Sequence, residues 1–272
     1  MNGLGIAELK KLTNQIRGKI VEMSYNGKAP HLGSALSCVD ILTALYFDIL
    51  SVDPGNSDYP NRDRFILSKG HAASALYAVL AYKGFFPLED LESYAKNGSC
   101  LAEHPGPYMP GIEVATGSLG HGLPIGVGMA LTGRLKKNSL RVFVLMSDGE
   151  CNEGSVWEAA MLASSKKLGN VIGIIDYNKW QATGRSREIL ALEPLKQKWE
   201  SFGWSCHEVD GHDLSAIIEA LKNVPENNEK PVVIIAHTVK GKGVSFMEDD
   251  NNWHYRIPTE EEVKKARTEL GL

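Results

Sequence analysis

The chain has 272 residues, of which 43% are hydrophobic and 23% are charged, and its formal net charge is −4. This composition is typical of a soluble globular protein with one large α/β domain or two small ones. The slight negative charge argues against a broad nucleic-acid surface, and no apolar run reaches the roughly eighteen residues that span a bilayer. Because the N-terminus shows no cationic stretch followed by a small-residue cleavage site, we expect no secretory signal. Because Cys38, Cys100, Cys151 and Cys206 form no CxxC pair, we expect reduced thiols in a cytoplasmic protein.

Helical periodicity and apolar runs alternate along the chain. Apolar residues spaced three and four apart predict an amphipathic helix over 4–24. Further helices are predicted over 39–50, 73–84, 88–96, the segment after the glycine-rich turn at 117–122, 155–168, 193–202, 214–223 and a charged, exposed 259–270. Apolar runs predict strands at 65–69, 141–146, 170–176, 204–209 and 231–237. Irregular or turn-rich loops are predicted at 26–37, 51–63 and 97–117.

This order of elements predicts an α/β fold. The strands read as apolar on both faces, which indicates a parallel sheet covered by helices on both faces. No repeat, low-complexity segment or linker interrupts the pattern. We therefore expect a single domain over residues 1–272.

Polar turns follow four of the predicted strands, and ligands of such sheets bind beyond the carboxyl ends of the strands. The turns are Gly70 to His71, Ser147 to Gly149, Tyr177 to Trp180, and Thr238 to Gly243. Asp148 and Asn178 are separated by about one βαβ crossover, so neighbouring parallel strands would bring both to the same edge of the sheet.

The residue types in these turns suit a divalent metal and a phosphate. A carboxylate, an amide oxygen and a backbone carbonyl are hard ligands of Mg²⁺ when phosphate oxygens and water complete its shell. Gly149 permits close backbone approach, and a helix opening with Ser155 and Glu158 as a capping box would aim its N-terminus at the same anion. Taken singly, each turn also suits an ordinary solvated turn. The prediction rests on their combination.

The segment SDGECNEGSVWEA, followed by IIDYNKWQATG, resembles the thiamine-diphosphate signature, in which GDG is followed one crossover later by Asn. Further segments resemble transketolases in that family's order. They are PHLGSALSCVDIL, RDRFILSKGHAASALYAVL, GIEVATGSLGHGLPIGVGMAL and HTVKGKGVSFME with the later WH. The resemblance covers nearly the whole chain and implies the thiamin diphosphate-binding fold.

The resemblance also implies a set of site residues. Asp148, the Asn178 side chain and the Trp180 carbonyl would ligate Mg²⁺, for which Ca²⁺ or Mn²⁺ can substitute. Cofactor contacts are implied for His71, Gly117, Ser118, Leu119, Asp148, Gly149, Glu150, Asn178 and His254. Catalytic roles in the substrate channel are implied for His31, His71, His104 and His254. Glu153 matches a glutamate of the family's subunit interface.

The implied chemistry needs proton donors and acceptors. Thiamine diphosphate supplies a carbanion that attacks a ketose carbonyl, and a two-carbon ketol unit then passes to an aldose. Alkoxides form and collapse on both substrates. The unperturbed pKa of histidine, about 6.5, fits this task near neutral pH.

Three positions depart from the family pattern. Ser147 replaces the first glycine of GDG, which is a mild change. His121 stands where the family usually has Gln and adds a titratable group beside the cofactor. The run from Trp253 through His254 and Tyr255 to Arg256 replaces WHG, so it either alters acceptor choice or is a neutral loop variation.

The resemblance covers only the diphosphate-binding half of the family. The pyrimidine domain, which supplies an activating glutamate and most phosphate-gripping groups, is therefore expected on a separate chain. We expect a split transketolase that is active only with its pyrimidine-domain subunit, the two kinds of chain forming an α2β2 heterotetramer. The substrates would be sugars or sugar phosphates.

Several other functions stay open. The chain could belong to a 1-deoxyxylulose-5-phosphate synthase-like enzyme, which shares the KGKG and metal signatures, or be the α chain of a 2-oxoacid dehydrogenase. It could act on an unusual branched, sulfonated or nucleotide-linked sugar. A non-enzymatic alternative is a subunit that binds cofactor without turnover.

Overall fold

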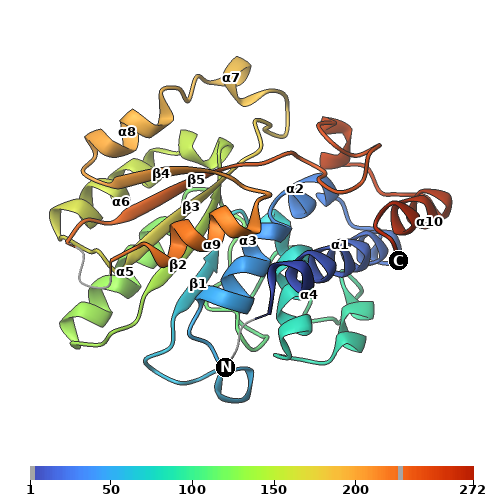
Figure 1. Cartoon of the computed structure of the whole chain (residues 1–272), viewed down its shortest axis with the longest axis horizontal. Coiled ribbons are helices and arrows are strands. Elements are labelled where there is room, and N and C mark those ends of the chain that lie inside the picture. Colours follow the sequence, from blue (N-terminus) through green and yellow to red (C-terminus); the bar gives the residue numbers. More distant parts are fainter. Residues whose placement is uncertain (1–3, 226–228) are drawn as a thin grey trace.

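The computed structural model describes residues 4–225 and 229–272. Within them, the strands form one sheet in the order β1-β2-β3-β5-β4 (Figure 1). The strands are β1 (Arg64–Leu67), β2 (Val142–Ser147), β3 (Val171–Tyr177), β4 (Ser205–Asp210) and β5 (Val232–His237). Every neighbouring pair runs parallel, so the prediction of a parallel sheet is confirmed.

Helices cover both faces of the sheet, as the sequence predicts (Figure 1). On one face lie α1 (Ile6–Gly27), α3 (Val39–Ala44), α4 (Ala73–Lys83), α9 (Leu214–Lys222) and α10 (Glu260–Glu269), and on the other α5 (Gly122–Leu135), α6 (Gly154–Ser165) and α8 (Leu195–Ser201). Side chains of β2 alternate between the two cores, Phe143 and Leu145 toward the first and Val144 and Met146 toward the second.

The two remaining α-helices of the described residues are also short. They are α2 (Leu32–Ser37) and α7 (Ser186–Ile189). The loop prediction for 26–37 is wrong at α2, because all six of its residues are buried under the turn that contains His254. Gly33 permits this contact, since an added Cβ would lie 3.1 Å from Lys240 Cγ and 3.3 Å from Trp253 Cβ.

Other local predictions also need correction. The helix expected over 39–50 ends at Ala44 and continues as a wider π-type turn, and the helix expected over 88–96 is 3₁₀ in form over Leu88–Ser93. The capping box is wrong, because α6 starts at Gly154 and the Ser155 hydroxyl donates to the Gly120 carbonyl oxygen (2.8 Å).

Strand β4 and helix α10 differ from their predicted exposure. As an edge strand, β4 lacks a neighbour on one side and buries only Cys206, so it is not apolar on both faces. Helix α10 is charged but buries Val263 and Ala266 as it packs along α1 (Figure 1). No helix in 4–225 or 229–272 is long and apolar enough to cross a membrane.

The carboxyl ends of β1, β2, β3 and β5 meet at one edge of the sheet. Ser147 stands opposite Asp176, and Tyr177 stands opposite His237. Helix α2 and the turn before α10 close over this edge, where the His31 N–H donates to the His254 carbonyl oxygen (2.9 Å). The polar turns predicted at the strand ends are therefore neighbours in space.

Candidate functional site

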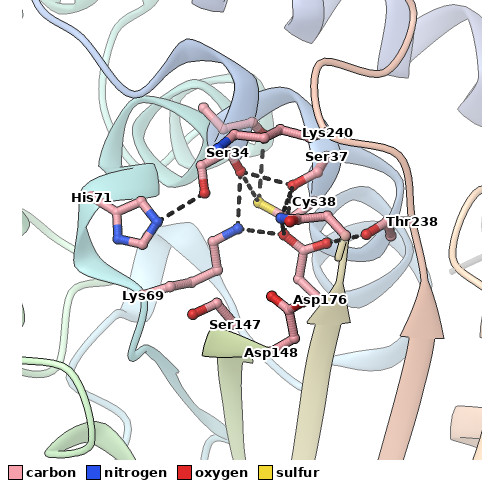
Figure 2. A network of polar contacts seen from close by, with 12 residues as sticks. Ser34, Ser37, Cys38, Lys69, His71, Ser147, Asp148, Asp176, Thr238 and Lys240 are labelled. Atoms are coloured by element: carbon pink, nitrogen blue, oxygen red, sulfur yellow. Dashed lines mark hydrogen bonds and ion pairs between the residues drawn. The ribbon is translucent and has the colours of Figure 1, made fainter. Parts of the chain in front are cut away.

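A buried ion pair lies at the centre of this edge. Figure 2 shows Lys69, which follows β1, pointing toward Asp176 in β3, and the two side chains are bonded and fully buried. Lys69 Nζ also donates to the Ser34 carbonyl oxygen of α2 (2.9 Å). Asp176 accepts from Ser37 Oγ (2.5 Å) and from the Thr238 hydroxyl. One carboxylate thus joins α2, β1, β3 and the turn after β5.

Both members of this pair stay charged. Burial alone would raise the pKa of Asp176, but the charge of Lys69 and three hydrogen bonds hold that pKa below its usual value. Burial would likewise lower the pKa of Lys69, and the attraction of Asp176 raises it instead. This pair was not predicted from the sequence, although a lone Asp inside the apolar run of β3 was a usable signal.

Asp148 carries a buried oxygen that has no hydrogen-bond partner. Its Oδ2 accepts from the Lys179 N–H (3.0 Å) and from Ser186 Oγ (2.7 Å), whereas Oδ1 is unpaired. Burial raises the pKa of Asp148 to about 6, the Ser186 hydrogen bond opposes this, and the charge of Asp176 adds to it. A buried, unpaired carboxylate oxygen is costly unless a cation satisfies it.

Asn178 lies beside Asp148 and presents an amide oxygen. Its Oδ1 accepts from the Trp180 N–H (3.1 Å), while its Nδ2 donates to Asp176 Oδ2 (3.3 Å). These bonds fix which end of the amide is the acceptor, and that oxygen keeps a second lone pair. A carboxylate oxygen without a partner and an oriented amide oxygen fit the hard-ligand set of a divalent cation.

The four predicted histidines come together above this edge. The ring centre of His31 lies 5.5 Å from that of His71, 6.1 Å from His104 and 5.1 Å from His254. They come from four separate segments of the chain, and His71 and His254 lie in short 3₁₀ helices. His71 is held in addition by Ser34, whose Oγ lies 2.8 Å from His71 Nε2. The geometry is that of one polar cluster, as the resemblance implies.

Three of these histidines have pKa values below the unperturbed value on which the sequence analysis relied. Burial, helped by repulsion from neighbouring cations and imidazoles, lowers the pKa of His31 to about 4 and that of His254 to about 3. Burial lowers the pKa of His71 well below its usual value. These three rings are therefore neutral near pH 7. The unperturbed pKa of about 6.5 does not describe them.

Lys240 joins the cluster from the turn after β5. Its Nζ donates to Asn251 Oδ1 (2.6 Å) and lies 3.2 Å from His254 Nδ1. Burial lowers its pKa to about 8, with repulsion from Lys69 as the next cause. The KGKG turn is thus not simply solvated, because Lys240 is only 1% exposed.

Glu150 supports the glycine-rich loop before α5. Its Oε1 accepts from the Gly120 N–H (2.8 Å) and from the Ser68 hydroxyl, and its Oε2 accepts from the Ser147 N–H (3.3 Å). Both oxygens of the Glu150 carboxylate therefore accept hydrogen bonds from the chain itself. These bonds position the loop that carries Gly117, Ser118 and Leu119. In that loop, a Cβ added to Gly117 would lie 3.3 Å from His104 Cδ2.

Three further sequence predictions lie outside the cluster. Glu153 is exposed at the start of α6, and His121 is exposed with Nδ1 3.2 Å from the Leu119 carbonyl oxygen. Arg256 pairs with Glu262 and lies over the Trp253 ring (4.5 Å). An open cavity of about 530 Å³ is lined by Ala182, Asn251, Asn252, Tyr255 and Arg256.

Residues 9–272 match a family of domains described as transketolase, thiamine diphosphate binding domain. A subunit of the apulose-4-phosphate transketolase of Phocaeicola vulgatus is 43% identical over 98% of this chain and 95% of its own length. The 6-deoxy-6-sulfo-D-fructose transketolase subunit SqwG of Clostridium sp. is 41% identical over 97% of this chain and 96% of its own length.

Solved structures agree with this match. The transketolase from Campylobacter jejuni superposes with a TM-score of 0.92 at 32% identity and covers 99% of this chain. The transketolase from Leishmania mexicana gives a TM-score of 0.90 at 28% identity. The chain spans 43% and 41% of the length of these two solved chains.

Proposed function

The chain belongs to the transketolase family, and we propose that it is the diphosphate-binding subunit of a split, thiamine-diphosphate-dependent transketolase. The observation that carries this proposal is the buried, unpaired Asp148 Oδ1 beside Asn178, at the same end of the sheet as the histidine cluster. Residues 1–272 form one diphosphate-type domain, and a second polypeptide completes the site. The relatives whose names describe them as single subunits of a transketolase support such a division.

Within this proposal, the turns after β2 and β3 hold the cofactor. Asp148, Asn178 and the Trp180 carbonyl bind Mg²⁺, and Ca²⁺ or Mn²⁺ can replace it. Gly149 contributes its N–H to the diphosphate. The thiamine group, when bound, supplies the carbanion of ketol transfer. In this proposal the chain binds and orients the cofactor, and it places side chains that can donate or accept protons around it.

The histidines act as hydrogen-bonding groups for the sugar. Because the pKa values of His31 and His254 lie near 4 and 3, their rings are neutral and can each donate and accept one hydrogen bond. Lys240, whose pKa is lowered to about 8, lies 3.2 Å from His254 Nδ1 and can donate to it, which leaves the Nε2–H of His254 as a donor. We propose that these rings bind sugar hydroxyls and carry protons between them.

The proposed donor is a ketose that carries an anionic group. The two relatives named above are described by a phosphorylated and a sulfonated sugar. A phosphorylated or sulfonated ketose is therefore the first substrate class to test, with an aldose as acceptor. The proposed assembly is a cytoplasmic α2β2 heterotetramer with a pyrimidine-domain subunit.

Reconstitution tests this proposal. The chain is mixed with a pyrimidine-domain transketolase subunit, thiamine diphosphate, Mg²⁺, a ketose phosphate and an aldose, and the products are identified by mass. We expect ketol transfer in the mixture, none with either chain alone, and loss of transfer when EDTA removes the metal. Formation of neither complex nor product would contradict the split-site proposal.

A ligand variant sharpens this test. Loss of a group that only orients a metal ligand already costs about 10- to 100-fold in affinity or activity. Asp148→Ala removes the ligand itself and is expected to exceed that loss in both cofactor retention and turnover. Asp213→Ala, an exposed residue that caps α9, is the matched control. Full activity of Asp148→Ala would contradict the metal assignment.

A further inference from the structure

Two buried polar atoms without a hydrogen-bond partner belong to side chains that flank Gly149. Within the described residues, five buried side-chain atoms lack such a partner: Thr43 Oγ1, Asp48 Oδ2, Asp148 Oδ1, Gln181 Nε2 and Trp199 Nε1. Of these, Asp48 is satisfied by an ion pair with Lys222 (2.7 Å). Asp148 directly precedes Gly149, and the Gln181 side chain packs on that glycine.

The position of Gln181 is fixed by its own turn. Its N–H donates to the Gly184 carbonyl oxygen (2.8 Å), which closes a tight loop after β3. Its side chain lies so close to Gly149 that an added Cβ there would be 2.9 Å from Gln181 Cγ and 3.3 Å from Cδ. The backbone N–H of Lys179, two residues earlier, donates to Asp148 Oδ2. This bond connects the turn after β3 to the turn after β2.

The two unpaired atoms have opposite chemical needs. A carboxylate oxygen accepts only, and when buried it calls for a cation or a donor. An amide NH₂ donates only, and when buried it calls for an oxygen, preferably an anionic one. A divalent metal bound to a diphosphate meets both needs at neighbouring positions. The other two unpaired atoms, in α3 and α8, show no such pairing.

We propose that Gln181 is a cofactor-binding residue, which donates a hydrogen bond from Nε2 to a diphosphate oxygen while Asp148 Oδ1 binds the metal. This inference rests on the proposed function. It adds a neutral donor to a site that already contains the cations Lys69 and Lys240, so it orients the anion without adding charge. No part of the thiamine-diphosphate signature marks Gln181, since the motif stops at the metal ligands.

Titration of the 272-residue chain with Mg²⁺ and inorganic pyrophosphate tests this inference by calorimetry, with thiamine diphosphate as the second probe. Gln181→Leu keeps the side-chain bulk and removes the donor. Hydrogen bonds to charged groups contribute about 1.5–3 kcal/mol, so we expect pyrophosphate to bind about 10- to 100-fold more weakly. Gln181→Glu places an anion against the ligand and should weaken binding further. Gln197→Leu, an exposed glutamine on α8, should bind like the wild type.

The melting temperature of each variant in EDTA separates a ligand role from a structural one. Because Gln181→Leu removes a buried donor that has no partner, its melting temperature should be unchanged or higher. Weaker binding together with a lower melting temperature would overturn the inference. Equal binding by Gln181→Leu and wild type would overturn it while leaving the proposed function intact. Failure of the wild type to bind pyrophosphate would instead overturn the proposed function.

Discussion

Asp148 destabilises the fold in its ionised form, which is the form that the proposed metal site requires. Its carboxylate is fully buried, and burial raises its pKa from 3.8 to about 6. A carboxyl group whose pKa is higher in the folded than in the unfolded chain favours folding less as pH rises between those two values. The rise corresponds to about 3 kcal/mol of destabilisation at neutral pH. The proposed metal ligand therefore lowers the stability of the metal-free chain at neutral pH.

Asp148→Asn should raise the stability of the metal-free chain while it abolishes metal binding. Asn keeps an oxygen that accepts from Lys179 and Ser186 and removes the buried charge. We expect a gain of about 1–3 kcal/mol in the free energy of unfolding at pH 7, measured by urea unfolding in EDTA.

The gain should shrink as the pH is lowered to 4, because Asp148 is then protonated in the wild type. Asp213→Asn at the exposed N-cap of α9 is the control and should change stability little. A variant that is less stable than wild type at pH 7 would contradict the buried-charge account.

Metal affinity should depend on pH through the same carboxyl group. Metal binding requires the ionised form, so a proton must leave when the pH is below the pKa of about 6. We expect Mn²⁺ affinity, measured by electron paramagnetic resonance, to fall about tenfold for each pH unit well below 6. It should level off above pH 7, whereas an affinity that keeps rising to pH 9 would point to a different ligand.

At the scale of elements, strand periodicity predicts correctly which polar turns are neighbours, because these turns lie directly at the ends of paired strands. Asp148 and Asn178 are found side by side because the spacing of one crossover fixes their strands as parallel neighbours. Helix α2, the Lys69–Asp176 pair and the buried position of Lys240 were not predicted, because each depends on contacts between segments distant in sequence. The histidine cluster was placed by resemblance, since no local pattern links four separate segments.

The pair of Lys69 and Asp176 should behave as a unit. Lys69→Met leaves the Asp176 carboxylate buried without its counter-charge, and such a loss costs about 3–5 kcal/mol. We expect urea unfolding to show this loss, and we expect Lys69→Met with Asp176→Leu to recover part of it because no buried charge remains.

The recovery should stay partial, because Ser37 and Thr238 also lose their acceptor. Lys166→Met is the control, because it replaces an exposed lysine at the C-cap of α6 and so measures the effect on stability of a Lys-to-Met change outside an ion pair of the core. A double variant that is no more stable than Lys69→Met would show that the uncompensated charge of Asp176 is not the main cause of the stability lost in Lys69→Met.

At the scale of the whole molecule, the sheet edge with the histidine cluster is where the proposed partner must close the site. Glu153 is exposed at the start of α6 and makes no side-chain capping bond there. The family resemblance implies that it lies in the subunit interface. Its exposure in the single chain fits a residue whose contacts lie in another chain.

Glu153→Ala should leave the isolated chain unaffected, with a free energy of unfolding within about 0.5 kcal/mol of the wild type. Assembly with the pyrimidine-domain subunit should weaken, and turnover at low subunit concentration should fall. Sedimentation of the mixture and initial rates measure these effects. Glu219→Ala on α9, at the opposite face of the sheet, is the control and should leave assembly unchanged.

The unpaired oxygen of Asp148 also bears on how long the subunit persists. A ligand that binds only the folded chain raises its stability by mass action, and a cation bound at the proposed site would also balance the buried charge of Asp148. Proteases act on transiently unfolded chains, so a chain loaded with metal and cofactor should be degraded more slowly than an unloaded one. The proposed role of Asp148 in holding the cofactor therefore links the lifetime of the subunit to whether metal and cofactor are bound.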